Sequence, residues 1–339
     1  MKAVDLFCGC GGMSLGFENA GVEVLAAYDN WAPAISIYKS NFSHPVHDLD
    51  LNAEEAIDHI KAYKPDIIIG GPPCQDFSIA GYRNMGERAN LTIRYAEIIS
   101  RLKPKWFVME NVYNIERMPV LPKATKIFKD AGYGLTTRIL NASYCGVPQA
   151  RMRFFMVGHL GDKDDFLGEL LDGRQTEKPM TVYDYLGDSL HTEYYYMHPR
   201  SYNRRAVFSI HEPSATIRGV NRPIPDGYKR HHADKADISD GVRALTSKER
   251  SYIQTFPESF VFEGKKTDVE QAIGNAVPVK LAEYVAKCIL DYELKEGAPG
   301  SPGGTFRISR RPCQQQAEHP RASTAPHPPA SNEGRAPRR

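Results

Sequence analysis

The chain has 339 residues, of which 41% are hydrophobic and 25% are charged, a balance that can bury the core of a globular protein. No apolar run is long enough to span a bilayer, and the first residues enter a strand pattern without a signal peptide, which predicts a cytoplasmic protein. The six cysteines are scattered and form no CxxC pair. We therefore expect neither a disulfide framework nor a metal site.

The net charge of +2 hides an uneven distribution. Residues 198–235 hold eight Lys/Arg and three Asp/Glu, and residues 297–339 hold seven Arg and two acids, so each segment carries +5. Subtracting both from the total leaves −8 on the rest of the chain. The sequence thus combines an acidic body with a basic patch and a basic tail. The tail also has eight prolines and almost no large apolar side chains, which predicts disorder.

Short apolar runs alternate with helical patterns along the first 160 residues, and this alternation predicts a doubly wound α/β sheet. Strand-like runs occupy residues 3–7, 22–28, 66–70, 106–109, 136–140 and 153–157, and helical spacing covers residues 32–40 and 91–102. In such sheets the ligand lies beyond the carboxyl ends of the strands. Residues 8–12, Asp29, Cys74 and Glu110 all come just after strand-like runs.

The periodicity weakens from about residue 161 to 240, a stretch rich in Tyr, His, Pro and Arg. Helical patterns return at residues 245–256 and 268–294, the second interrupted at Gly274-Asn275 and at Pro278. We predict four segments: a large domain over 1–160, a small domain over 161–266, a C-terminal helical segment over 267–296 and a disordered tail over 297–339.

Two prolines precede Cys74 in Gly70-Gly-Pro-Pro-Cys-Gln75, where a buried strand ends. They fix the backbone of a turn that presents the thiol in a cleft, as a nucleophile requires, although a buried structural cysteine is the alternative. The glycine-rich turn in residues 5–12 suits either a bound nucleotide or close packing. Asp29 suits either a ribose hydroxyl or a helix N-cap.

Two further groups carry potential chemistry. Glu110 follows a run of large apolar residues, where burial raises the pKa of a carboxyl so that it can act as an acid near neutral pH. A capping or salt-bridging role is the alternative. Gln149, Arg151 and Arg153 alternate along an incipient strand and point the same way. They form either an ordinary edge-strand charge pair or a guanidinium fork for a base edge, a phosphate or a carboxylate.

Five blocks, in this order and approximate spacing, resemble those of the DNA (cytosine-5) methyltransferases over roughly residues 1–294. They are Asp5-Leu-Phe-x-Gly-x-Gly-Gly12, Gly-Pro-Pro-Cys-Gln75, Glu110-Asn-Val112, Gln149-x-Arg-x-Arg153 and Gly274-Asn-Ala-Val-Pro278. The resemblance implies a Rossmann-like, S-adenosyl-L-methionine-dependent methyltransferase sheet with a small target-recognition domain at 161–266, and a segment 267–296 that returns to the catalytic domain. The implied reaction is methyl transfer to C5 of cytosine in double-stranded DNA.

The resemblance also implies roles for individual residues. Cys74 adds to carbon 6 of a flipped-out cytosine, Glu110 protonates ring N3, and Arg151 and Arg153 lie near the cytosine and its backbone. Asn111 helps to orient that region. The implied cofactor contacts are Phe7, Gly9, Gly11, Asp29, Asn30, Asp48, Leu49, Pro73, Asn275 and Val277. The implied DNA contacts are Gln75, Ser78 and Arg83 in a mobile loop, and Thr216 and Arg218 in the target-recognition region.

Several alternatives stay open at this stage. The tRNA branch of the same family shares the Pro-Pro-Cys but usually carries a Cys-Phe-Thr block, which this sequence lacks. A non-catalytic DNA-binding module is disfavoured by the intact Cys74 and Glu110. A nicotinamide-dependent dehydrogenase is disfavoured because G-x-G-x-x-G is missing, and exocyclic-amine methylation because an Asn/Asp-Pro-Pro-aromatic block is missing.

We expect a monomer that acts on duplex DNA. Its size fits the modification half of a restriction–modification system, with a cognate endonuclease as a functional but not a physical partner, or equally a solitary methylase. The arginines of the tail predict weak, salt-sensitive and nonspecific DNA affinity.

Overall fold

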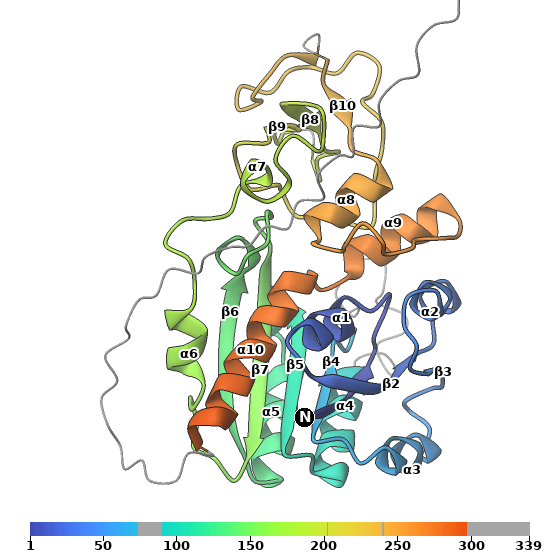
Figure 1. Ribbon diagram of the computed structural model, residues 1–339, viewed down its shortest axis with the longest axis vertical. Helices are drawn as coiled ribbons and strands as arrows, with labels where there is room; N and C mark the ends of the chain where they lie inside the picture. The colour runs from blue at the N-terminus through green and yellow to red at the C-terminus, as the bar shows by residue number, and fades with distance from the viewer. Residues whose placement is uncertain (74–89, 202, 239–240, 297–339) are drawn as a thin grey trace, which may run out of the picture. The chain divides into compact units, whose positions relative to one another are not determined.

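The computed structural model describes residues 1–73, 90–201, 203–238 and 241–296, and its centre is a seven-stranded sheet (Figure 1). The strand order is β3-β2-β1-β4-β5-β7-β6. The strands are β1 (Lys2–Leu6), β2 (Glu23–Asp29), β3 (Val46–Asp48), β4 (Ile67–Gly70), β5 (Trp106–Val112), β6 (Tyr133–Asn141) and β7 (Met152–Leu160). The first five pair in parallel, and β7 runs antiparallel to both β5 and β6. This arrangement confirms the predicted doubly wound α/β fold.

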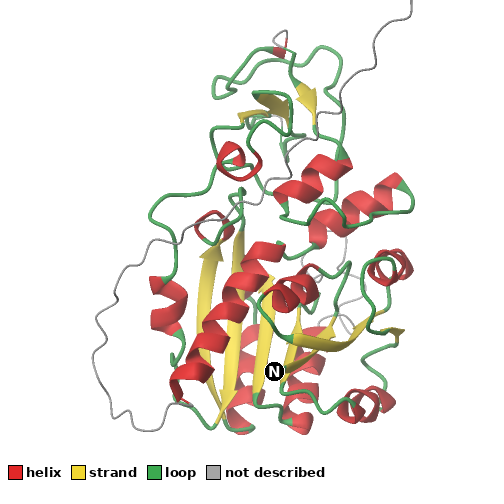
Figure 2. Ribbon diagram, in the orientation of Figure 1, coloured by secondary structure: helices red, strands yellow, loops and turns green. Residues whose placement is uncertain are grey.

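Helices cover both faces of this sheet, as Figure 2 shows. One face carries α1 (Gly12–Asn19), α6 (Gly168–Gly173) and α10 (Val279–Glu296), and the other carries α3 (Glu55–Ala62), α4 (Asn90–Leu102) and α5 (Val120–Asp130). The run Ile67-Ile-Ile69 explains why β4 is central: Ile67 and Ile69 pack in one layer and Ile68 in the other. A strand covered on both faces has no polar side to show in its sequence.

A second, three-stranded sheet lies beyond the carboxyl ends of the parallel strands (Figure 1). It consists of β8 (Tyr194–Tyr196), β9 (Val207–Ser209) and β10 (Arg243–Ala244), and it is accompanied by α7 (Val182–Leu186), α8 (Ser247–Ile253) and α9 (Lys266–Asn275). Its core gathers around Tyr195, Phe208 and Ile217. The strands of this sheet are only two or three residues long, which explains the weak periodicity of the sequence here.

The division into segments at 160, 266 and 296 stays a prediction. Within the range assigned to the small domain, α6 packs on β6 and α10 and shares the core of the large sheet. Helix α2 (Ala32–Lys39) lies beside β3, and two short 3-10 helices span Tyr113–Arg117 and Ala142–Tyr144. In the ranges described above, no helix is both long and apolar enough to cross a membrane.

The chain returns to the large sheet through the junction of α9 and α10. The predicted interruption is confirmed, because α9 ends at Asn275 and α10 begins at Val279. Helix α10 then packs directly on α1. Gly16 allows this contact, since a Cβ there would lie only 2.5 Å from the carbonyl oxygen of Val279 and from the Cβ of Ala282. The junction is thereby held beside the glycine-rich turn that precedes α1.

Candidate active site

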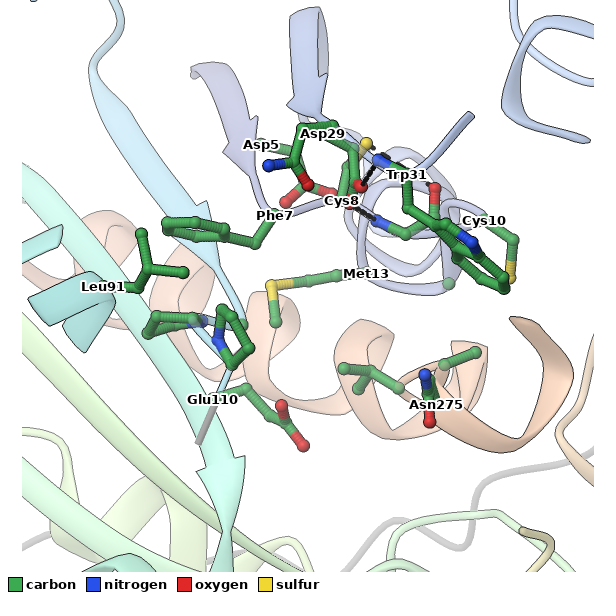
Figure 3. Close-up of a pocket in the computed structure, with 18 of the residues that line it drawn as sticks. Asp5, Phe7, Cys8, Cys10, Met13, Asp29, Trp31, Leu91, Glu110 and Asn275 are labelled. Carbon is green, nitrogen blue, oxygen red and sulfur yellow. Dashed lines mark hydrogen bonds between the residues drawn. The ribbon is translucent and has the colours of Figure 1, made fainter. Parts of the chain in front are cut away.

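A cavity of about 750 Å³ opens where the parallel strands end (Figure 3). Its wall contains Phe7 after β1, Asp29 at the end of β2, residues 71–73 after β4, Glu110 in β5, and Asn275 at the end of α9 with the two residues that follow it. Side chains from five separate parts of the sequence therefore face one space. This is the ligand position that the doubly wound topology favours.

Most of the residues predicted to bind a cofactor line this cavity. They are Phe7, Gly9, Asp29, Asn30, Leu49, Pro73, Asn275 and Val277. Two do not line it: Gly11 is the N-cap of α1, and Asp48 is the last residue of β3, directly before Leu49. Trp31 and Asp50 also line it, although they are not among the predicted cofactor contacts. Their places in the sequence could have indicated them, because each directly follows a predicted contact, Asn30 and Leu49 respectively.

The four loop residues of the prediction, Cys74, Gln75, Ser78 and Arg83, lie outside the described residues. The turn that leads to them is described. The Asn111 side chain donates a hydrogen bond to the carbonyl oxygen of Pro72 at 2.9 Å. A Cβ on Gly71 would lie 3.2 Å from Glu110 Oε2. The chain therefore passes against β5 beside Glu110 and lines the cavity up to Pro73, the residue before Cys74.

Asp29 joins the two loops at the upper end of the cavity in Figure 3. Its Oδ2 accepts a hydrogen bond from the backbone N–H of Gly9 and its Oδ1 accepts one from the backbone N–H of Trp31, both at 2.8 Å. The N-cap position of α2 is Trp31 itself, so Asp29 does not cap that helix. Each carboxylate oxygen retains a lone pair for a further donor, such as a ligand hydroxyl.

The loop after β1 has an unusual backbone. Phe7 has a φ of 58° and Gly9 a φ of 54°, both in the left-handed region. Glycine adopts this conformation freely, but for a phenylalanine it costs roughly 1–2 kcal/mol. Such outliers cluster at functional sites. The strained turn places the Phe7 side chain in the cavity wall (Figure 3).

Asp5 is a buried carboxyl group in the same wall. Its Oδ2 accepts a hydrogen bond from the Ser14 hydroxyl at 2.6 Å, and its Oδ1 has no hydrogen-bond partner within the described residues. Burial raises the pKa of Asp5 to about 7, helped by the nearby charge of Asp29 and opposed by the Ser14 hydrogen bond. The group is therefore held protonated well above the ordinary pKa of an aspartate.

This shift predicts a pH-dependent stability. Between about pH 4 and 7 the folded protein binds a proton at Asp5 that the unfolded chain releases, so the free energy of unfolding falls as pH rises through this window. Asp5→Asn keeps the acceptor for Ser14 but removes the titration. The stability of the variant relative to wild type is expected to rise by up to about 4 kcal/mol from pH 4 to 7. Urea unfolding of both proteins across this range, with the exposed-site variant Asp226→Asn as control, measures the difference. A difference that does not change with pH would show that Asp5 ionises normally.

Glu110 and Arg153 form an ion pair in the cavity wall. Arg153 Nε lies 3.0 Å from Glu110 Oε1, and the two side chains are 14% and 11% exposed. Burial raises the pKa of Glu110, while the guanidinium groups of Arg153 and Arg151 act in the opposite direction without cancelling it. Glu110 therefore has the raised pKa that the sequence predicts, and it also forms a salt bridge, the alternative role considered for it.

The strand that carries Glu110 is longer than predicted. The expected strand ended at Met109, whereas β5 continues to Val112. It does so because residues 110–112 pair with Phe155, Phe154 and Arg153 of β7. Glu110 therefore lies within the strand, and its backbone is fixed by the sheet.

Arg151 is fully buried and does not line the cavity. Its guanidinium donates hydrogen bonds to the carbonyl oxygens of Ile217, Gly274 and Ala276, at 2.8, 2.9 and 3.1 Å. Gln149 supports the same place, because its Oε1 accepts a hydrogen bond from the backbone N–H of Ile217. Of the two arginines of the predicted fork, only Arg153 lines the cavity. Arg151 instead links Gly274 and Ala276 of the cavity wall to Ile217, in the segment between β9 and β10.

Thr216 and Arg218 lie on that segment and outside the cavity lining. The Thr216 hydroxyl donates a hydrogen bond to the carbonyl oxygen of Ala150 at 2.9 Å, and Arg218 donates one to the carbonyl oxygen of His198. Both residues are partly exposed. The structure thus places them next to the cavity wall, with Ile217 between them bonded to Arg151.

Comparisons with known proteins identify the chain as a methyltransferase and show its family. Residues 1–291 match the family model of the C-5 cytosine-specific DNA methylases. The chain is 58% identical over 296 residues to Type II methyltransferase M.HindV of Haemophilus influenzae, covering 86% of this chain and 97% of that protein. It is 52% identical over 294 residues to Type II methyltransferase M.HgiDI of Herpetosiphon aurantiacus, covering 86% and 95%.

The fold resembles the crystal structure of the S. pombe Dnmt2 methyltransferase, with a TM-score of 0.64 and 17% identity over 86% of this chain and 98% of that one. The chain belongs to the C-5 cytosine-specific DNA methylase family. It is a DNA cytosine-5-methyltransferase, and DNA is its substrate. The resemblance drawn from the five sequence blocks is confirmed.

Proposed function

We propose that this protein transfers the methyl group of S-adenosyl-L-methionine to carbon 5 of a cytosine flipped out of duplex DNA, with Cys74 as covalent nucleophile. One observation carries the proposal. A single cavity joins an end suited to a nucleotide, at Phe7 and Asp29, to the Glu110–Arg153 pair, and the turn that precedes Cys74 forms part of its wall.

The residues at the upper end of the cavity fit S-adenosyl-L-methionine, which would supply an electrophilic methyl group on a sulfonium. Phe7 and Trp31 offer flat apolar surfaces for an adenine ring, and Asp29 offers acceptors for ribose hydroxyls. Asp29 and Asp50 suit the positive sulfonium and ammonium groups. The amino end of α1, where Gly12 and Met13 line the cavity, suits the carboxylate.

The chain's own groups divide the remaining chemistry. The Cys74 thiolate adds to carbon 6 of the cytosine. The electrons of the 5,6 double bond shift to the 4,5 position and those of the 3,4 double bond shift to N3, which takes a proton from Glu110. Carbon 5 of the resulting enamine would take the methyl group from the sulfonium, whose sulfur would keep the electrons of the broken bond as a thioether. A base then removes the proton from carbon 5, the 5,6 double bond re-forms as Cys74 leaves as a thiolate, and N3 returns its proton to Glu110. Arg153 orients Glu110, and Asn111 holds the turn before Cys74.

DNA contacts are proposed for Gln75, Ser78 and Arg83 after the nucleophile and for Thr216 and Arg218 beside the cavity wall. Flipping the cytosine costs a few kcal/mol, which contacts of this kind offset. The two relatives at 58% and 52% identity are named Type II methyltransferases. By analogy, we assign this enzyme to the modification half of a restriction–modification system, acting as a monomer beside a separate endonuclease.

The test is methyl transfer from labelled S-adenosyl-L-methionine to unmethylated genomic duplex DNA and, in parallel, to tRNA. Label in duplex DNA, recovered as 5-methylcytosine after hydrolysis and mapped at base resolution, is the expected result. Label confined to tRNA would instead assign the enzyme to the RNA branch. Label recovered on the exocyclic amine of cytosine would contradict the proposal, because methylation of that amine needs no covalent nucleophile such as Cys74.

A further inference from the structure

The loop after β3 contributes four consecutive residues, 49–52, to the wall of the cavity. This loop lies outside the sheet, because β3 ends at Asp48 and α3 begins at Glu55. The backbone N–H of Asn52 donates a hydrogen bond to Asp50 Oδ1 at 3.0 Å, which shapes the turn from within. A bond inside the loop does not determine where the loop lies relative to the other walls of the cavity, so its backbone must be held from outside.

Arg94 of α4 supplies that hold. Its Nε donates a hydrogen bond to the carbonyl oxygen of Leu51 at 2.7 Å, and its Nη2 donates one to the carbonyl oxygen of Ala53 at 2.9 Å. Its Nη1 lies 3.1 Å from Glu54 Oε1. Among the described residues, no other side chain from outside the loop donates a hydrogen bond to these two carbonyl groups. One guanidinium group therefore fixes the backbone on both sides of residue 52.

The helix that carries Arg94 is itself anchored in the core. The Arg94 side chain is 7% exposed, and a cation buried to this extent must keep its donors hydrogen-bonded. The next residue, Tyr95, is fully buried, and its hydroxyl donates a hydrogen bond to the carbonyl oxygen of Val108 at 2.8 Å. Leu91, one turn earlier on the same helix, lines the cavity (Figure 3). Helix α4 thus holds the loop in a fixed place relative to β5, the strand that carries Glu110.

Arg94 does not line the cavity, so any effect it has on a ligand passes through the loop. The loop presents Leu49, a predicted cofactor contact, and Asp50, which suits a positive group of S-adenosyl-L-methionine. An unrestrained loop must be ordered when a ligand binds, and this loss of conformational freedom weakens binding. A loop that is already ordered in the free protein avoids this loss.

We propose that Arg94 is a positioning residue for cofactor binding, which holds residues 49–52 in the arrangement that receives S-adenosyl-L-methionine. This inference rests on the proposed function, because it requires that cofactor at this end of the cavity. The contact exists in the free protein and favours the bound cofactor and the transition state equally. Arg94 therefore affects the Kd and the KM of the cofactor and leaves kcat unchanged.

The test compares Arg94→Gln and Arg94→Lys with Arg101→Gln. Arg101 is a matched control on the same helix: its Nη1 lies 2.5 Å from Glu54 Oε2, but its side chain is 51% exposed and, within the described ranges, donates no hydrogen bond to a carbonyl of the loop. Calorimetric titration of the full-length protein with S-adenosyl-L-methionine, without DNA, measures the Kd. Arg94→Gln is expected to raise the Kd about tenfold or more, as the loss of hydrogen bonds from a charged donor does, whereas Arg101→Gln stays near wild type.

Arg94→Lys keeps the positive charge but lacks the planar fork that reaches two carbonyl groups, so it is expected to raise the Kd as well. This variant carries the test if Arg94→Gln does not fold. A wild-type Kd in either Arg94 variant would overturn the proposal.

Steady-state kinetics separate positioning from a general loss of stability. Both Arg94 variants are expected to raise the KM of the cofactor, while the KM of duplex DNA and the kcat at saturating cofactor stay within about twofold of wild type. A lower kcat with an unchanged cofactor KM would contradict the positioning role. The proposed function and this inference fail separately. A wild-type protein that binds no S-adenosyl-L-methionine contradicts the former, whereas a wild-type protein that binds it no more tightly than the Arg94 variants contradicts the latter alone.

Discussion

Replacing Cys74 with alanine is expected to lower methyl transfer to duplex DNA by at least about three orders of magnitude, because the thiolate is the group that makes carbon 5 nucleophilic. Without a covalent bond at carbon 6, the aromatic ring offers no enamine to attack the methyl group. The described turn that precedes Cys74 in the sequence supports this role. Pro72 and Pro73 restrict the backbone directly before it, and the Asn111 side chain bonds the carbonyl oxygen of Pro72.

The covalent step has a readout of its own. In a duplex with 5-fluorocytosine at the target, the fluorine cannot leave as a proton, so the adduct persists and the protein–DNA complex survives denaturing electrophoresis. We expect this complex with wild type and with Cys313→Ala, which changes a cysteine of the C-terminal tail, and none with Cys74→Ala. Retained affinity of Cys74→Ala for DNA would show that the fold is intact. A Cys74→Ala enzyme that methylates at the wild-type rate would exclude the thiol as nucleophile.

Glu110→Gln is expected to reduce the rate by about 10²- to 10³-fold, the range typical of a lost proton donor. The glutamine amide can still accept the hydrogen bond from Arg153 but has no proton to give to N3. The matched control is Glu116→Gln, which removes an exposed carboxylate a few residues further along the chain. Equal melting temperatures for the three proteins would separate catalysis from stability.

The pH dependence of the rate provides a second signature for Glu110. An acid catalyst acts in its protonated form, so the wild-type rate falls as pH rises through the pKa of Glu110. Burial raises that pKa, which moves the fall toward neutral pH. The Glu110→Gln variant is expected to lack this alkaline fall. The same pH profile in both proteins, at similar rates, would assign N3 protonation to another group.

The arginine pair illustrates where local sequence patterns stop being informative. The two-residue alternation of a strand predicts that Arg151 and Arg153 point the same way, but β7 begins only at Met152. Arg153 obeys the strand geometry and meets Glu110 across the β5–β7 pairing. Arg151 lies ahead of the strand, and its donors are used by three carbonyl groups from distant parts of the chain. The role of Arg151 therefore depends on residues 217 and 274–276, which are too far away in the sequence for a local pattern to connect them with it.

The sheet, the family and the reaction could all be predicted from the sequence alone. Each is encoded locally: buried strands as apolar runs such as Ile67-Ile-Ile69, the glycine-rich turn by residues that tolerate a left-handed backbone, and the chemistry by blocks of adjacent residues. The three-dimensional arrangement was needed to show which predicted residues share the cavity and that Asp29 ties Gly9 to Trp31. The reason is physical: these properties depend on distances between segments that lie 20 to more than 100 residues apart in the chain, such as Gly9 with Asp29 and Arg151 with Gly274.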